Sequence, residues 1–361
     1  MGEHTTEAES LERVAQYTAN YLSTILSSNM ILGIAWGTTT SAISRNLVPK
    51  TTHHSQIVQL NGAGNTESLG IEYASEILMR FAQNFRATYH LFPVPAFFDR
   101  VETKKSLWEE TSIKRILELQ TRADIWLYSI GSVSAGIPSH LHADGYLKKA
   151  DYSDLKRLDI AGDIATVFFR EDGSYHNIQI NQRSSGPSLE LLKHKRGICV
   201  ISGQAKLKGL MAAIRGKLLS ELILDEPTAG LDPLMQHKFF NLIRQENKRG
   251  ATVFFSSHIL GEVQRMCNRV AIIKEGSIIN IQDIKTLQKD NYKKIRVTAE
   301  GVAEVHFDLP GVTKLEHEDG TLSFFFKGDI NLLMRRISEN EITDVTIEDL
   351  TLEEIFMHYY E

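Results

Sequence analysis

The sequence predicts an α/β fold built on a parallel sheet, because short apolar segments alternate with segments of helical periodicity. Four apolar segments typical of buried strands occur at residues 30–36, 56–60, 123–130 and 197–202, and glycine follows each within two residues. Hydrophobic residues make up 42% of the 361 residues. That share supports sizeable cores, and the length suggests about two domains.

The elements follow from periodicity, taken in chain order. Residues 7–28 are a helix because Leu11, Val14 and Thr18 recur at spacings of three and four. Further helices are expected at 42–47, 70–86, 106–120, 151–158, 204–217, 233–248 and 258–267. Further strands are expected at 88–95, 163–170, 175–180, 221–225 and 251–256. A hairpin is expected around Glu275-Gly276.

The pattern changes at about residue 292, where shorter alternating segments begin. Strands at 293–299 and 321–327 and helices near 330–339 and 351–359 predict a small α+β module. We therefore expect three parts: residues 1–224, residues 225–290 and residues 291–361.

Charge and cysteine content narrow the class of protein. Lys and Arg number 40 and Asp and Glu 45, so the net charge of −5 gives no global reason to bind nucleic acid. Two cysteines, Cys199 and Cys267, fit a reducing compartment. The polar N-terminus is unlike a signal peptide, and no apolar stretch approaches ~18 residues. A cytoplasmic location is expected, peripheral to the membrane if a permease is bound.

Small and polar residues follow several of the expected strands. The segments are GTTT (37–40), NGAG (61–64), IGS (130–132), AGD (161–163) and SGQAK (202–206). Carboxyl ends of parallel strands meet at one edge of a sheet. Backbone amides at glycine-rich turns and helix N-termini bind phosphate, and Lys206 adds a positive charge. The sequence therefore predicts an anion site at that edge.

These segments, in this order, resemble the effector domain of SorC-type sugar-sensing transcriptional regulators. The resemblance covers about residues 7–224 and includes LGIAWGTT (32–39), PVPAFF (93–98) and ICVISGQAKLKGLMAAIRGKL (198–218). It implies a Rossmann-like fold related to sugar-phosphate isomerases, and a phosphorylated sugar as effector. Carried over by position, it implies an effector site of Gly37, Thr38, Thr39, Gly62, Gly64, Gly131, Ser132, Asp163, Arg183, Gly203 and Lys206.

Members of that family carry an N-terminal helix-turn-helix domain. No recognition helix or basic arm is evident before residue 30, so DNA binding is not expected from this chain alone. The sequence leaves open whether the chain forms a homo-oligomer.

A second resemblance begins at residues 222–232, LILDEPTAGLD, where an apolar strand ends in Asp225 and Glu226. This is the Walker B pattern of ABC transporter ATP-binding subunits, and the resemblance to their C-terminal half runs over about 222–361. It implies that Asp225 holds Mg²⁺ through water and that Glu226 orients or deprotonates the attacking water. It also places Asp232 in the D-loop and makes His258 the switch histidine, with an ABC permease as a partner. An acidic strand end with a buried histidine is the alternative.

The phosphate loop of such ATPases is missing from the sequence. The motif G-x-x-x-x-G-K-[ST] does not occur, and after the nearest spacing, Gly131 to Gly136, Ile137-Pro138 follows. No useful ATP hydrolysis is expected, and Mg-ATP is not an expected cofactor. Residues 201–204, ISGQ, fit either a degenerate ABC signature loop or the sugar-binding family, and the second fits better through Lys206.

These observations favour a sugar-phosphate-binding effector domain joined near residues 219–228 to half of an ABC ATPase. The alternatives are an ABC ATP-binding subunit and a sugar-phosphate isomerase or deaminase. An ABC half without its first strands exposes a sheet edge. It would extend the sugar domain's sheet, pair with another chain, or be poorly ordered.

Overall fold

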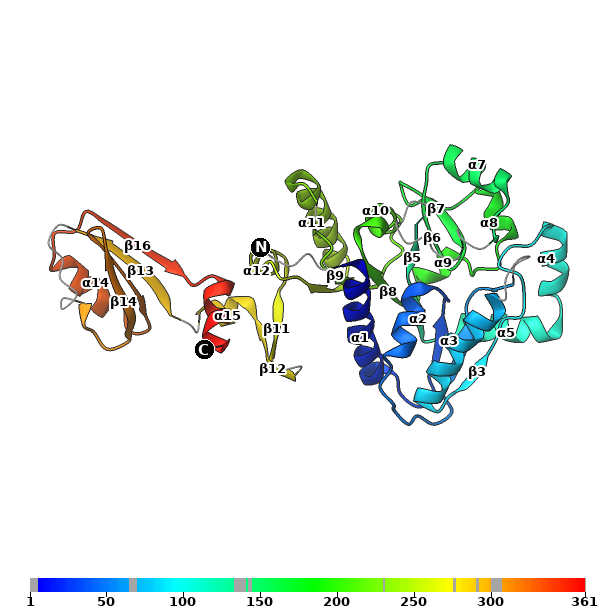
Figure 1. The fold of residues 1–361 in the computed structure, drawn as a ribbon, viewed down its shortest axis with the longest axis horizontal. Helices are drawn as coiled ribbons and strands as arrows, with labels where there is room; N and C mark the ends of the chain where they lie inside the picture. The colour runs from blue at the N-terminus through cyan, green and yellow to red at the C-terminus, as the bar shows by residue number, and fades with distance from the viewer. Residues whose placement is uncertain are drawn as a thin grey trace. The chain divides into compact units, whose positions relative to one another are not determined.

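The computed structural model describes residues 6–64, 70–132, 141, 145–229, 231–274, 277–289, 292–299 and 307–360 (Figure 1). The chain divides into two compact units, Met1–Ser256 and Ser257–Glu361. Within the described residues, no helix is long and apolar enough to cross a lipid bilayer.

The first unit contains both helices and strands in alternation. Its helices are α1 (Glu7–Ile25), α2 (Thr38–Arg45), α3 (Gly70–Phe85), α4 (Val101–Trp108), α5 (Thr111–Arg122), α7 (Lys149–Arg157), α8 (Gln179–Arg183), α9 (Leu189–Leu192), the 3₁₀ turn η1 (Gln204–Lys206), α10 (Leu207–Arg215) and α11 (Pro233–Lys248). Its strands are β1 (Ile31–Ile34), β2 (Gln56–Gln59), β3 (Thr88–His90), β4 (Ile125–Tyr128), β5 (Ile130–Gly131), β6 (Ile160–Ile164), β7 (Val167–Arg170), β8 (Arg196–Ser202), β9 (Glu221–Asp225) and β10 (Thr252–Ser256).

A seven-stranded sheet in the order β10-β9-β8-β4-β1-β2-β3 forms the centre of this unit. Every neighbouring pair in it is parallel, which confirms the predicted fold class. β1 and β4 are fully buried, as apolar strands covered on both faces must be. Successive connections run outward in opposite directions from β1 and β4. The point between these two strands is therefore the topological switch point of the sheet.

The ABC-like segment extends this sheet. β9 pairs with β8, and β10 pairs with β9, so that β10 forms the edge. Phe254 of β10 lies 5.1 Å from Tyr21 of α1 between ring centroids, and Phe255 lies 6.4 Å from Phe240 of α11. Successive residues of a strand point to opposite faces, so α1 and α11 cover opposite faces of the sheet there. Of the three expected arrangements, the structure shows the extended sheet.

Two predicted strands of the first unit are wrong. The segment 163–170 is not one strand, because the chain reverses between β6 and β7 at Ala165 and Thr166, whose φ angles are 49° and 68°. Non-glycine residues rarely adopt such angles, so composition gives no signal of the turn. The segment 175–180 is not a strand either, because α8 begins at Gln179. The helix expected at 106–120 is divided between α4 and α5.

The second unit contains a hairpin and a small α+β module. Its elements are α12 (Leu260–Met266), β11 (Arg269–Lys274), β12 (Ser277–Asp283), α13 (Ile284–Lys289), β13 (Lys293–Thr298), β14 (Val312–Glu318), β15 (Thr321–Phe326), α14 (Ile330–Ser338), β16 (Asp344–Asp349) and α15 (Leu352–Tyr360). β11 and β12 are antiparallel, as the predicted hairpin requires, while Glu275-Gly276 lies outside the described residues.

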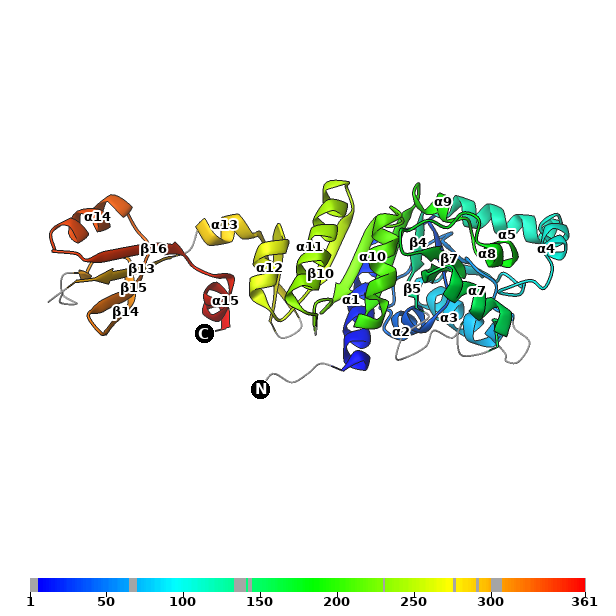
Figure 2. The same cartoon turned by 90° about the horizontal axis from the view of Figure 1, so that it is seen from above.

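The strands β14-β15-β13-β16 form an antiparallel sheet beside α14 (Figure 2). Alternate residues of β15, namely Leu322, Phe324 and Phe326, are buried and pack with Leu333 of α14. This period-two burial is typical of a sheet with one covered face. β13, β15, α14 and α15 correspond to the strands expected at 293–299 and 321–327 and the helices expected near 330–339 and 351–359.

Candidate functional site

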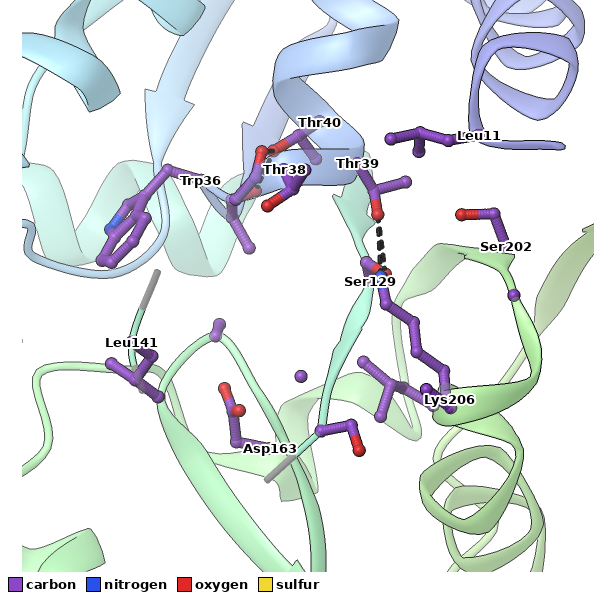
Figure 3. Close-up of a pocket in the computed structure, with 18 of the residues that line it drawn as sticks. Leu11, Trp36, Thr38, Thr39, Thr40, Ser129, Leu141, Asp163, Ser202 and Lys206 are labelled. Atoms are coloured by element: carbon purple, nitrogen blue, oxygen red, sulfur yellow. Dashed lines mark hydrogen bonds between the residues drawn. The ribbon is translucent and has the colours of Figure 1, made fainter. Parts of the chain in front are cut away.

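A cavity of about 100 Å³ opens at the carboxyl ends of β1, β4 and β8, next to the switch point of the sheet (Figure 3). Open α/β sheets bind ligands at this place. The volume is several times what one water molecule needs, about 10–15 Å³ on the same measure. Its lining includes Glu7, Leu11, Ala35, Trp36, Gly37, Thr38, Thr39, Thr40, Asn61, Ser129, Ile130, Gly131, Ser132, Leu141, Asp163, Ala165, Thr166, Ser202, Gly203, Ala205 and Lys206.

One wall of the cavity is the N-terminus of α2. Gly37 is its N-cap residue, and a Cβ added at Gly37 would meet open space. Thr38 and Thr39 belong to the first turn, whose amides have no partner within the helix and carry the positive end of its dipole. The Thr40 hydroxyl donates to the carbonyl oxygen of Ala35 at 2.9 Å and so fixes this turn. The wall therefore favours an anion.

Lys206 extends into the cavity next to this wall. Its Nζ donates to Thr39 Oγ1 and to Ser129 Oγ, both at 2.9 Å. An ammonium group has three donors, so the described residues leave one for a ligand. Burial lowers the pKa of Lys206 to about 8, while the negative charges of Asp163 and Glu7 oppose that shift. At neutral pH the cavity thus holds a partly desolvated cation.

Asp163 lies across the cavity from the threonines of α2 (Figure 3). Its side chain is buried, and its Oδ2 accepts a hydrogen bond from the Thr166 amide at 3.1 Å. Its Oδ1 has no hydrogen-bond partner among the described residues. Burial raises the pKa of Asp163 to about 6. A buried acceptor without a partner costs free energy that a ligand hydroxyl can recover.

Two positions around these groups favour glycine, Gly131 for space and Gly203 for its positive φ. A Cβ at Gly131 would lie 2.0 Å from Asp163 Oδ1, so any side chain there would displace the carboxylate. Gly203 adopts a φ of +78°, and its missing Cβ would lie 3.5 Å from Glu7 Oε1. Ser132 is also in the lining and is buried. The structure thus brings together Gly37, Thr38, Thr39, Gly131, Ser132, Asp163, Gly203 and Lys206.

Three of the expected effector residues lie outside the lining of this cavity. A Cβ at Gly62 would lie 2.3 Å from the Val94 carbonyl oxygen, so this glycine permits close backbone packing. The backbone of Gly64 bonds to Val94 and Ala96. Arg183 forms an ion pair with Asp151 and donates to the Phe98 carbonyl oxygen at 3.2 Å.

The cavity also contains residues that were not expected there. Asn61 is buried, and its Oδ1, like that of Asp163, has no partner among the described residues. Ser129 holds Lys206, while Glu7 and Leu11 of α1 contribute a wall. Asn61 follows β2 as the first residue of NGAG, and Ser129 follows β4, so their positions at strand ends were a usable signal.

The ABC-like residues lie in different surroundings. Asp232 is the N-cap of α11, where its Oδ1 accepts from the Leu234 and Met235 amides at 3.0 Å. Glu226 follows β9 with a φ of 45°, and its amide donates to the Ser256 carbonyl oxygen. His258 is exposed and belongs to the second unit.

Asp225 is paired with a cation from the protein itself. Its Oδ2 accepts hydrogen bonds from Arg13 Nε at 3.1 Å and Nη2 at 2.8 Å. The Asp225 side chain is 3% exposed. A guanidinium in that position already supplies the positive charge that a Mg²⁺ ion would supply, so the donor set does not fit the metal. No group of three or more metal-ligating side chains occurs within the described ranges.

An open parallel sheet with a polar cavity at its switch point defines a small-molecule-binding α/β domain. The sequence assigns it to a family: residues 1–231 match the model of the putative sugar-binding domain. The chain belongs to this family, and these residues are a sugar-binding domain of the SorC and DeoR regulator type.

Sugar-binding regulators match the N-terminal part of the chain. The deoxyribonucleoside regulator of Bacillus subtilis is 32% identical over 217 residues, which are 60% of this chain and 68% of that protein. A domain of a possible sugar-binding transcriptional regulator from Arthrobacter aurescens is 47% identical, with a TM-score of 0.58 over 63% of this chain and 88% of that one.

ABC ATP-binding proteins match the C-terminal half. The bacitracin transport ATP-binding protein BcrA of Bacillus licheniformis is 33% identical over 146 residues, which are 38% of this chain. The chain spans 47% of the length of that relative.

Proposed function

We propose that the cavity binds a phosphorylated sugar, as the effector site of a transcriptional regulator. One observation carries the proposal: the two ends of a single cavity have opposite chemistry. Lys206, Thr39 and the first turn of α2 present donors and positive charge, and Asp163 presents a buried acceptor without a described partner. A sugar phosphate has an anionic end and a hydroxyl-bearing end, which match these two walls.

Each residue has a role in this proposal. Lys206 pairs with the phosphate, and the amides and hydroxyls of Thr38 and Thr39 donate to its oxygens. Asp163 accepts a hydrogen bond from a sugar hydroxyl, and Asn61 binds a second hydroxyl. Gly37, Gly131 and Gly203 leave the space that the ligand occupies. Ser132 lies along the sugar.

The relative from Bacillus subtilis is named a deoxyribonucleoside regulator, which directs the choice of ligands toward pentose phosphates. Hexose and hexitol phosphates belong in the same panel, because the cavity itself does not define the chain length of the sugar.

For the C-terminal part, we propose an origin by fusion near residues 219–228. The chain then comprises an effector domain (1–224), a partial ABC domain (225–290) and an accessory module (291–361). The family match to residue 231 and the ABC relatives of the C-terminal half support this division. The ion pair of Asp225 with Arg13 supports a segment that does not hydrolyse ATP. An ABC permease remains a partner to be tested for this segment.

Thermal unfolding of the full chain with a panel of sugar phosphates tests the proposal, with Mg-ATP as the comparison. A ligand that binds only the native state stabilises it by about 2.7 kcal/mol at 100 times its Kd. For a unit of this size that raises Tm by about 5–10 °C. A shift with a sugar phosphate and none with Mg-ATP is expected. A shift with Mg-ATP alone would overturn the proposal in favour of an ATP-binding subunit.

An isomerase is the second candidate, and a specific observation favours it. Asp163 and Lys206, with pKa values of about 6 and about 8, both titrate near neutral pH in one cavity, as acid–base pairs do. Incubation of the sugar phosphates with the protein, followed by proton NMR, separates the two functions. Conversion of a sugar that is lost in Asp163→Asn identifies an enzyme, and binding without conversion identifies an effector site.

A further inference from the structure

The acidic end of β9 has no role in the proposed effector site, yet the structure connects it to that site through α1. Asp225 bonds to Arg13, and Arg13 stands one half-turn beyond Leu11, which lines the cavity together with Glu7. We infer that the Arg13–Asp225 ion pair positions the first turns of α1 as a wall of the effector cavity. Asp225 is therefore a positioning residue for effector binding. This inference rests on the proposed function.

The start of α1 has weaker ties to the rest of the fold than the remainder of the helix has. From Val14 onward the helix is held by buried side chains, which include Ala15, Ala19 and Leu22. Before Val14, only Ser10 is buried, and Glu7, Glu9 and Glu12 are exposed. The local stabilisation at this end is a capping box between Thr6 and Glu9, and besides the Arg13 ion pair it is tied to the fold by the partly buried Leu11 and by a bond from Asn46 Nδ2 to Glu12 Oε1 at 2.8 Å. A capping box shapes a helix terminus but does not tie it to the rest of the fold.

The ion pair supplies that tie in a favourable geometry. Two nitrogens of Arg13 converge on one oxygen of Asp225, whose side chain is 3% exposed while that of Arg13 is 47% exposed. A buried carboxylate depends on its partner more strongly than an exposed guanidinium does. Asp225 is fixed in turn, because β9 pairs with β8 on one side and β10 on the other.

The anchor acts on groups that face the ligand. Glu7 of α1 lies beside Gly203. Gly203 belongs to the turn that leads into η1, which ends at Lys206. The negative charge of Glu7 also acts on the Lys206 ammonium. If the first turns of α1 move away, the cavity loses a wall next to its cation, and water enters there. Effector affinity then falls although no residue that touches the ligand has changed.

A second tie between α1 and β9 provides a matched control. Tyr21 Oη donates to Glu221 Oε2 at 2.8 Å, on the same helix and the same strand but at the end away from the cavity. Tyr21→Phe removes this bond and the one that Tyr21 Oη accepts from Arg196 Nη2 at 3.0 Å, while leaving the first turns of α1 unchanged. Arg13→Met and Asp225→Asn remove the ion pair from either side, and Arg13→Met/Asp225→Asn removes both partners.

The experiment measures the affinity of the full chain for inorganic phosphate and for the panel of sugar phosphates by calorimetry. Amide hydrogen exchange of residues 9–15 is measured on the same variants. Loss of the ion pair should weaken sugar-phosphate binding about tenfold, within the range for residues that act without ligand contact. The double variant should lose no more than Arg13→Met, because the pair acts as one unit. Exchange should accelerate in residues 9–15 alone, and Tyr21→Phe should bind as the wild type does.

Each outcome distinguishes this inference from the proposed function. Wild-type affinity in both single variants, with faster exchange at α1, would overturn the positioning role and leave the effector site standing. Equal weakening in Tyr21→Phe would overturn it as well, because a general loosening of α1 would then suffice. A wild-type chain that binds neither phosphate nor any sugar phosphate would overturn the proposed function itself, and this inference with it.

Discussion

Replacing Lys206 by methionine should weaken effector binding and at the same time stabilise the protein without ligand. Methionine keeps much of the stem of the side chain and removes the ammonium group. The bond from that group to a phosphate is charge-assisted and contributes about 1.5–3 kcal/mol. The Kd for a sugar phosphate should therefore rise about 10- to 150-fold.

The expected gain in stability follows from the burial of the Lys206 ammonium group. The pKa of Lys206 falls from 10.5 to about 8, and at ~1.4 kcal/mol per unit this represents at most about 3–4 kcal/mol of cost to the charged form. Residual contact with water reduces that cost. The variant also loses the two hydrogen bonds that Lys206 donates, while the bond from Thr39 Oγ1 to Ser129 Oγ at 3.3 Å remains. A net gain of about 1–2 kcal/mol in the free energy of unfolding is expected at pH 7.

Urea denaturation and calorimetry measure the two effects separately. Lys208→Met is the control, because Lys208 lies two residues away, is exposed, and pairs with Glu171 outside the cavity. It should change neither the affinity nor, beyond about 0.5 kcal/mol, the stability. A Lys206→Met protein that is less stable than the wild type, or one that binds the sugar phosphate normally, would refute the reasoning.

Four further outcomes are expected. Asp163→Asn should weaken binding of a sugar phosphate but not of inorganic phosphate in calorimetry, because Asp163 faces the sugar; equal loss for both would contradict this. Gly131→Ala should destabilise by about 1–3 kcal/mol in urea denaturation, because the added methyl would lie 2.0 Å from Asp163 Oδ1; a wild-type midpoint would count against it. Asp163 binds its proton more tightly in the folded state, with a pKa of about 6, so its contribution to stability should fall from about pH 4 to pH 6, and Asp163→Asn should lack this slope. Limited proteolysis should cut after Ser256, where the two compact units meet in the chain, and leave a stable N-terminal fragment; an intact chain would contradict it.

Hydrophobic periodicity predicted most of the helices and strands, because burial of one face makes apolar residues recur at regular spacings in the sequence. The segment 233–248 coincides with α11, and 221–225 coincides with β9. The β6–β7 turn left no such trace, because Ala165 and Thr166 are not turn-forming residues. The turn is held by a local bond from the Thr166 amide to Asp163 and by a tertiary bond between the hydroxyls of Thr166 and Ser184 at 2.9 Å.

For the candidate site, strand ends located the cavity but did not separate residues that face it from residues that pack behind it. Gly62 and Asn61 are neighbours, yet only Asn61 is in the lining. Arg13 could not have been found at all. Its partner Asp225 is 212 positions away, and the motif around Asp225 pointed to a metal instead.

From β8 outward, the seven-stranded sheet is extended by repeating one unit, a strand followed by a helix that returns to the same edge, in the order β8, α10, β9, α11 and β10. Each added strand needs only the unpaired amides and carbonyls of the strand before it, and an apolar face for its helix. The unpaired edge of such an open sheet can therefore be extended by any segment that presents a strand and a helix in the correct order. β9 and β10 have that order. Genetic joining at such an edge can therefore preserve a folded core even when the appended segment arose for a different purpose.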